Sequence, residues 1–160
     1  MVTAFQKGLN TTGPNIKGLA KKVTFSKKIQ PIQLPEQDYE VPAGTKVTTA
    51  GWGKTEHRVN YTPFLLEIST KIIDSQTCEK LFSSTKGVKV TERNICAENF
   101  KEKKVACGGD SGGPLELNGT LIGVVSWGDC NSPAEVVEKY TTVFSDVRDF
   151  IPWIKKHAAI

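Results

Sequence analysis

The feature that most limits the fold is a pair of apolar segments separated by Asn118-Gly119. Leu115 to Leu117 precedes this dipeptide, and Thr120 to Trp127 follows it. Asn-Gly favours a two-residue type I′ turn, whose twist matches that of two antiparallel strands. The stretch therefore predicts a β-hairpin that any fold proposed for this chain must contain.

Two further segments predict strands, and a third predicts an extended connection. Lys46 to Trp52 alternates between polar and apolar residues, and Leu65 to Ile73 is a second strand candidate. Val23 to Leu34 is apolar but interrupted, and Pro31 and Pro35 exclude a central strand there. This region is therefore expected to be an extended connector.

Helix signals are few. Cys78 to Phe82 could form a short helix. Asp149 can cap a terminal helix that runs to about His157, with Pro152 tolerated in its first turn. Short strands, many turns and one terminal helix predict an all-β fold, either a barrel or a sandwich.

The composition excludes several classes. With 160 residues, 38% hydrophobic, the chain is long enough for one domain with a core. A net charge of +4 with scattered lysines does not favour nucleic acid, and no apolar run is long enough to predict a membrane helix. Residues 1–22 have no periodic pattern and no apolar signal-peptide core, so they are left unassigned, as a disordered or foreign stretch.

The four cysteines have no CxxC spacing, which favours two disulfides over a metal site. Three Asn-x-Thr sequons, at Asn10, Asn60 and Asn118, are compatible with a glycosylating compartment, although such tripeptides also occur by chance. Both features are typical of a secreted protein.

One segment suits catalysis, the run from Cys107 to Pro114 that reads CGGDSGGP. Its serine, Ser111, has glycines nearby on both sides, which allow unusual backbone angles and let a substrate carbonyl approach main-chain N–H groups. A bare Gly-Ser-Gly is more often a surface loop. The full string, followed by an aromatic hairpin, is far more specific and indicates a nucleophile.

The chain resembles the trypsin/chymotrypsin serine endopeptidases (peptidase S1) from Val23 to Ile160. The residues that carry the resemblance are GDSGGP, Gly51-Trp52-Gly53, Ser126-Trp127-Gly128 and Trp153-Ile154. The resemblance implies the trypsin-like double β-barrel fold. Residues 23–160 would be its interdomain connector, second barrel and C-terminal helix, with the first barrel missing.

The resemblance also assigns roles. Ser111 matches the nucleophile, and the backbone N–H groups of Gly109 and Ser111 match the oxyanion hole. Asp110 matches the carboxylate that pairs with a new N-terminal amine after zymogen cleavage. The implied disulfides are Cys78–Cys96 and Cys107–Cys130. Val47 and Leu117 stand where many members have a further cysteine pair.

The substrate pocket implied by the resemblance is apolar. Val105 would form its floor, where trypsin-like members have Asp, and Gly128 and Thr142 would form its walls beside Ser126 and Trp127. Such a pocket favours small or medium aliphatic side chains, as in elastase- or chymotrypsin-like members, over Arg or Lys.

The family's histidine and aspartate segments are absent from the printed residues. A serine needs a base and an orienting acid, and neither the Thr-Ala-Ala-His-Cys-like nor the Asp-Ile-Ala-Leu-like segment occurs. His57 is expected to be an exposed loop residue, and His157 to be a residue of the helix C-terminus. The chain alone is therefore expected to be inactive, and the loss of the first barrel should leave apolar surface exposed.

We interpret the chain as part of a secreted serine endopeptidase, from a truncated product or an incomplete gene model. It would act on polypeptides and meet protease inhibitors, with no cofactor, metal, nucleic acid or membrane. The alternative is a non-catalytic homologue that works as a binding or decoy module. A disulfide-bonded β domain with no family function is a remote third reading, because the motifs occur in the family's order.

Overall fold

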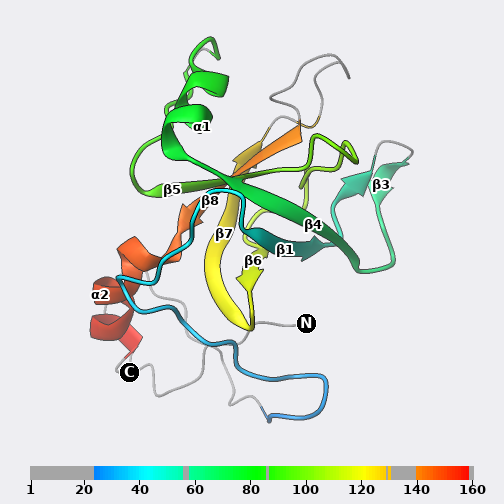
Figure 1. Cartoon of the computed structure of the whole chain (residues 1–160). Coiled ribbons are helices and arrows are strands. Elements are labelled where there is room, and N and C mark those ends of the chain that lie inside the picture. The colour runs from blue at the N-terminus through cyan, green and yellow to red at the C-terminus, as the bar shows by residue number, and fades with distance from the viewer. Residues whose placement is uncertain (1–23, 56–57, 86, 129, 131–139, 159–160) are drawn as a thin grey trace.

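The computed structural model describes residues 24–55, 58–85, 87–128, 130 and 140–158. Six strands form a closed antiparallel barrel in the order β1-β4-β5-β8-β7-β6, and two short strands form a separate sheet (Figure 1). The elements are β1 Lys46–Gly51, β2 Lys54–Thr55, β3 Arg58–Tyr61, β4 Leu66–Ile73, α1 Ser75–Phe82, β5 Asn94–Glu98, β6 Pro114–Leu117, β7 Thr120–Gly128, β8 Thr141–Asp146 and α2 Val147–Ala158. The expected barrel of an all-β fold with a C-terminal helix is confirmed.

Alternating side chains fill the inside of the barrel. Its main core comprises Val47, Ile72, Ile95, Ala97, Ala106, Leu115, Ile122, Val125 and Phe144. Gly123 has to be small, because a Cβ there would lie 3.1 Å from the Cβ atoms of both Leu115 and Phe144. Leu117 packs against the same core as Val47, so both positions of the family's further cysteine pair are occupied by packed apolar residues.

The predicted hairpin is confirmed as β6 and β7. Asn118 and Gly119 have φ values of 50° and 80°, the left-handed pair that a type I′ turn requires. The two other predicted strands also form, as β1 and β4, each one residue shorter than the sequence suggested.

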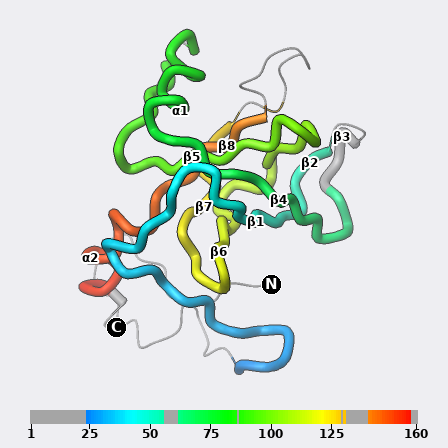
Figure 2. Tube along the Cα trace, viewed as in Figure 1, coloured from blue at the N-terminus to red at the C-terminus, as the bar shows by residue number. Residues whose placement is uncertain are grey.

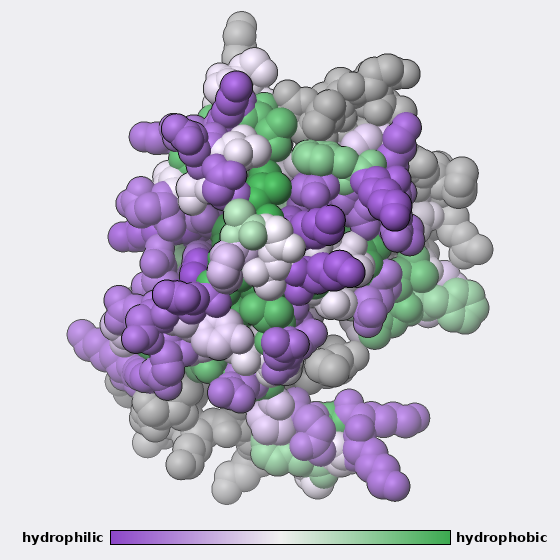
Figure 3. Space-filling view, in the orientation of Figure 1, coloured by the Kyte–Doolittle hydropathy of each residue, from purple (hydrophilic) through white to green (hydrophobic). Residues whose placement is uncertain are grey.

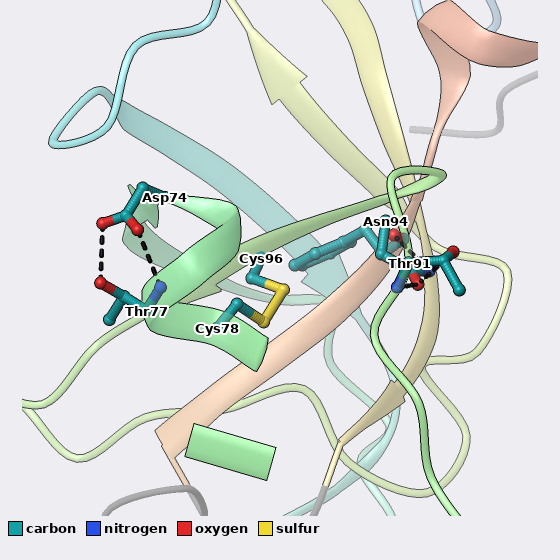
Figure 4. Close-up of a disulfide and its surroundings, with 7 residues drawn as sticks. Asp74, Thr77, Cys78, Thr91, Asn94 and Cys96 are labelled. Atoms are coloured by element: carbon teal, nitrogen blue, oxygen red, sulfur yellow. Dashed lines mark hydrogen bonds between the residues drawn. A yellow bond between two sulfur atoms is a disulfide. The ribbon is translucent and has the colours of Figure 1, made fainter. Parts of the chain in front are cut away.

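Helix α1 starts at Ser75, three residues before the predicted start at Cys78. Asp74 is the cause, because its carboxylate accepts hydrogen bonds from the Thr77 N–H at 2.8 Å and the Thr77 hydroxyl at 2.7 Å (Figure 4). The Cys78–Cys96 disulfide joins this helix to β5, as the resemblance implied.

Helix α2 starts at Val147, so the prediction that Asp149 caps it is wrong. Asp146 at the end of β8 accepts from the Arg148 N–H at 3.1 Å and starts the helix earlier. Pro152 is therefore the sixth helical residue, inside the helix instead of in its first turn. A proline there removes one backbone hydrogen bond, which packing must offset. Ile151 supplies such packing with Leu121 and Val147.

The connector expected over Val23 to Leu34 is described from residue 24, and the irregular chain continues to residue 45, past the β6–β7 hairpin toward α2 (Figure 2). Gln33 pairs in parallel with Thr120, with hydrogen bonds from Gln33 N to Gly119 O (3.3 Å) and from Leu121 N to Gln33 O (2.9 Å). The stretch 1–22 lies outside the described residues. No helix among the described residues is long and apolar enough to cross a membrane.

Candidate active site

The segment from Cys107 to Gly113 is a loop that leads into β6 and is held by backbone hydrogen bonds. Asp110 N donates to Cys107 O at 2.9 Å, and Gly113 N donates to Asp110 O at 2.8 Å. Val125 in β7 accepts from Gly112 N at 2.9 Å, and its own N–H donates to Gly113 O at 2.8 Å. The loop is thus fixed to the barrel at its C-terminal end.

Different structural reasons require glycine at different positions of this loop. Gly109 and Gly112 have φ values of 103° and 82°, a backbone conformation that would be strained in a residue with a side chain. A Cβ on Gly113 would lie 2.8 Å from Asp110 O and 3.2 Å from Ala50 O. Ser111 itself is exposed. The glycines therefore form a tight loop that presents the serine to solvent.

The Asp110 carboxylate turns inward and holds a distant segment. Its Oδ1 accepts from Gly53 N at 2.7 Å, and its Oδ2 accepts from Cys107 N at 2.9 Å. A Cβ on Gly51 would lie 1.9 Å from Oδ1, and one on Gly53 would lie 2.3 Å from Oδ2. This contact explains why glycines flank Trp52, a role that the sequence motif alone did not reveal.

Three N–H groups of the loop, those of Gly108, Gly109 and Ser111, have no acceptor among the described residues. Within the described parts of the chain, neither Gly109 N nor Ser111 N donates to a protein acceptor, whereas the N–H groups of Asp110, Gly112 and Gly113 do. N–H groups without an acceptor, at a serine and two residues before it, suit an anion that develops on a bound carbonyl.

The residues expected to line a pocket lie around the end of β7. Gly128 pairs with Thr142 in β8, and a Cβ on Gly128 would meet Thr141 O at 3.2 Å and Ala106 O at 3.9 Å. The Thr142 hydroxyl accepts from Ala106 N at 3.2 Å, beside the half-buried Val105. The chain thus brings the segments of Val105, Gly128 and Thr142 together.

Ser126 and Trp127 differ in their surroundings. The pairing of β7 with β8 shifts between Val125 and Trp127, which leaves Ser126 unpaired and exposed. Trp127 packs edge-on against Phe82 with ring centroids 4.8 Å apart. This contact joins the strand to the smaller core around Cys78 and Val143.

The second disulfide, Cys107–Cys130, ties the start of the serine loop to the segment after β7, as the resemblance implied. Lys54 is a neighbour of the loop that the sequence did not single out. Its N–H donates to Gly108 O at 2.9 Å, and its Cδ lies 3.8 Å from the position of a Gly108 Cβ. Only its place directly after Gly53 could have pointed to it.

Of the two histidines, His157 lies among the described residues, away from the serine loop. His157 lies in the last turn of α2, where its Nδ1 is 2.7 Å from Trp153 O and its ring packs on Trp153. This agrees with the expected role at the helix C-terminus. His57 lies outside the described residues, between β2 and β3 in the sequence, so its expected place in an exposed loop stays a prediction. No cluster of potential metal ligands occurs among the described residues.

A closed antiparallel barrel that presents a glycine-flanked serine from an anchored loop defines the class of β-barrel serine proteases. The family comparison agrees: the Trypsin family model matches residues 16–154. The chain belongs to the trypsin family.

Individual relatives give the same picture. Trypsin 5G1 of Aedes aegypti is 40% identical over 139 residues, which is 86% of this chain and 50% of that protein. Cathepsin G of Homo sapiens is 33% identical over 138 residues, 86% of this chain and 49% of the relative. The chain thus spans about half the length of these relatives.

The similar solved structures include a serine protease and an inactivated protease paralogue. Neuropsin, a serine protease expressed in the limbic system of mouse brain, has a TM-score of 0.74 at 31% identity, covering 87% of this chain and 58% of its own. The scabies mite inactivated protease paralogue S-D1 has a TM-score of 0.70 at 28% identity, covering 81% and 54%. Family membership alone therefore does not establish activity.

Proposed function

We propose that this chain carries the nucleophile half of a serine endopeptidase site. In the Ser-His-Asp mechanism of this family, Ser111 Oγ would attack the peptide carbonyl while a histidine takes its proton. The N–H groups of Gly109 and Ser111 would bind the resulting oxyanion. The observation that carries the proposal is the exposed Ser111 on a loop that Asp110 fixes, where its own N–H and that of Gly109 have no acceptor among the described residues.

The base and its orienting acid would come from polypeptide beyond the printed residues. An apolar strip beside the site supports this proposal: Trp52, Phe64, Leu65 and Leu66 are all exposed, Phe64 to 69%. Apolar side chains gather on the same edge of the surface, where β4 begins (Figure 3). Trp52 stands between the two glycines that contact Asp110, so a covering half would adjoin the site.

Reactivity toward a fluorophosphonate tests the assignment. The reagent should label this 160-residue chain no faster than its Ser111→Ala variant, because no base activates the hydroxyl. Rapid labelling of Ser111 by this chain alone would contradict both the half-site and the non-catalytic alternative.

Sequencing the 5′ end of the transcript tests the origin of the base. An upstream reading frame with the histidine and aspartate segments would support the endopeptidase. A genuine start at Met1 without such segments would refute it.

The proposed specificity is for small or medium aliphatic residues. The half-buried Val105 floor offers no charge to a basic side chain, and Thr142 reduces the space that a glycine would leave. In protein expressed from the extended reading frame, Val105→Asp should raise cleavage after Arg or Lys by at least about tenfold, since an aspartate pairs with the cation. Unaltered preference in a folded variant would remove Val105 from the pocket.

A non-catalytic binding module is the second candidate, favoured by the inactivated paralogue among similar structures. It predicts that the chain alone binds polypeptides or protease inhibitors without cleaving them. Retention of binding in Ser111→Ala, together with a genuine start at Met1, would favour it over the endopeptidase. Both candidates place the protein outside the cell, where its two disulfides persist.

A further inference from the structure

The β6–β7 turn combines a glycosylation sequon with an exposed acceptor. The tripeptide Asn118-Gly119-Thr120 matches Asn-x-Thr, and Asn118 is exposed at the tip of the hairpin. Asn10 and the side chain of Asn60, in the other two sequons, lie outside the described part of the structure. Asn118 is therefore the sequon asparagine whose surroundings can be examined.

The side-chain amide of Asn118 is not needed to hold the turn. Gly119 N donates to the Glu116 carboxylate, and Gly119 O accepts from Gln33 N at 3.3 Å. The amide of Asn118 makes no hydrogen bond to the described residues. A substituent on its nitrogen would remove no contact of the folded hairpin.

The turn also lies away from the candidate active site. Strand β6 separates them, with the serine loop before Pro114 and the turn after Leu117. Four residues of strand span roughly 13 Å at about 3.3 Å per residue. The β6–β7 turn lies at the opposite end of the barrel from α1 (Figure 1). A bulky hydrophilic group on Asn118 would leave Ser111 accessible.

We propose that Asn118 is an N-glycosylation site. In the transfer, Asn118 Nδ2 forms a bond to the anomeric carbon of an oligosaccharide carried on a lipid diphosphate. The bond between that carbon and the diphosphate oxygen breaks, its electron pair leaves with the diphosphate, and Nδ2 gives up one proton. The inference rests on entry into the secretory pathway, part of the proposed function, and not on proteolysis.

The burial of Thr120 sets the time of modification. Thr120 is only 5% exposed, pairs with Leu117 and bridges to Gln33. An enzyme that reads the sequon needs access to its third residue, and the closed hairpin hides that residue. Transfer therefore occurs before β6 and β7 pair, while the segment is still extended.

The test expresses the full chain behind a cleavable signal sequence in a eukaryotic host, and analyses only secreted protein with both disulfides. A glycoamidase, which hydrolyses the amide bond between asparagine and the sugar, should leave aspartate at position 118 of the wild type. Thr120→Ser keeps the sequon and should retain the modification, whereas Asn118→Gln should lose it. Secreted, disulfide-bonded wild type with an unmodified Asn118 overturns the proposal.

The timing has its own readout. With purified oligosaccharyltransferase and a lipid diphosphate-linked oligosaccharide, reduced and unfolded chain should be modified at Asn118 at least about tenfold faster than folded, oxidised chain. Asn60→Gln in both samples removes the neighbouring sequon from the comparison. Equal rates would show that the buried Thr120 does not protect the site.

Discussion

Two carboxylates, Asp110 and Asp146, differ in how they hold a segment that is distant in sequence, since Asp110 contacts it directly and Asp146 acts through Arg148. Asp110 accepts from the backbone N–H groups of Gly53 and Cys107 at 2.7 Å and 2.9 Å. Asp146 binds the guanidinium of Arg148, with Nε at 2.9 Å and Nη2 at 2.5 Å. Arg148 in turn donates to Tyr39 O of the connector at 2.9 Å.

The difference determines which substitutions can break each contact. The partners of Asp110 are main-chain N–H groups, which no substitution of their own side chains removes. Substitutions near Asp110 can break the contact only by adding atoms that collide with its carboxylate. Asp146 depends on one side chain, and its proximity raises the pKa of Arg148. Because the charged form of Arg148 is favoured in the folded chain, the contribution of the arginine is complete below its ordinary pKa and is lost as the pH rises through the higher folded pKa.

Asp146→Ala should have the largest effect on stability. It would leave the Arg148 guanidinium without its carboxylate where the aspartate is only 4% exposed, and it removes the side chain at the start of α2. Because the Arg148 side chain stays 23% exposed, the loss should lie at the lower end of the range for buried pairs, about 3 kcal/mol. Urea denaturation measures this loss. The control is Asp149→Ala, an exposed position in the same helix, and equal losses in both variants would contradict the role of Asp146.

Gly53→Ala should have the next largest effect, and it tests the Asp110 contact. The new Cβ would lie 2.3 Å from Oδ2, 2.4 Å from Cγ and 2.6 Å from Oδ1 of Asp110, so the carboxylate must move. Overpacking of this kind costs roughly 2–3 kcal/mol. Gly108→Ala is the matched control, since its nearest atom would be Lys54 Cδ at 3.8 Å. Similar stability of the two variants would show that the Asp110 carboxylate adjusts freely.

Asp110→Asn should have a smaller effect, because the amide keeps one acceptor and loses the other. A hydrogen bond to a charged group contributes about 2 kcal/mol. Hydrogen exchange should be faster at either the Gly53 or the Cys107 amide. The core amides of β7 should speed up only as far as the global stability falls. Unchanged protection of both amides would mean that neither depends on the charge of Asp110.

The sequence predicted the elements of the molecule that depend on local signals. The Asn118-Gly119 turn, the β1 and β4 strands and the serine loop all follow from turn chemistry, alternation or a local motif. The reach of Asp110 to Gly53 could not be derived that way, because the two residues are 57 positions apart. Contacts between segments brought together only by closure of the barrel leave no periodic signal.

The predicted start of α2 was wrong for a related reason. Asp149 and Asp146 are both good N-terminal residues by type, and local preference cannot choose between them. Tertiary contacts decide, since Asp146 is placed by β8 and accepts from the Arg148 N–H at 3.1 Å. For α1, the sequence does carry the start signal, because Asp74 is a favourable N-cap residue directly before Ser75.

Asp74→Ala should have the smallest effect and a distinctive pH dependence. Asp74 is an exposed counterpart of Asp110, since it too accepts a backbone N–H, that of Thr77 at 2.8 Å. Hydrogen bonds from the Thr77 N–H and hydroxyl hold the pKa of Asp74 below its ordinary value of 3.8. The ionised form is thus favoured in the folded chain, and its contribution is present above 3.8 and lost as the pH falls through the lower folded pKa.

The stability difference between wild type and Asp74→Ala, followed by thermal denaturation over a pH series, should therefore be constant near neutrality and vanish in acid. Thr77→Val is the matched variant, because it removes the hydroxyl donor but leaves the N–H, and it should show part of the difference with the same pH dependence. A difference that persists unchanged below the folded pKa would assign the effect to helix propensity instead of the charge. The contribution of a charged carboxylate that accepts hydrogen bonds from backbone N–H groups could then not be inferred from Asp74. For the Asp110 contact it would have to be measured in the Asp110 and Gly53 variants.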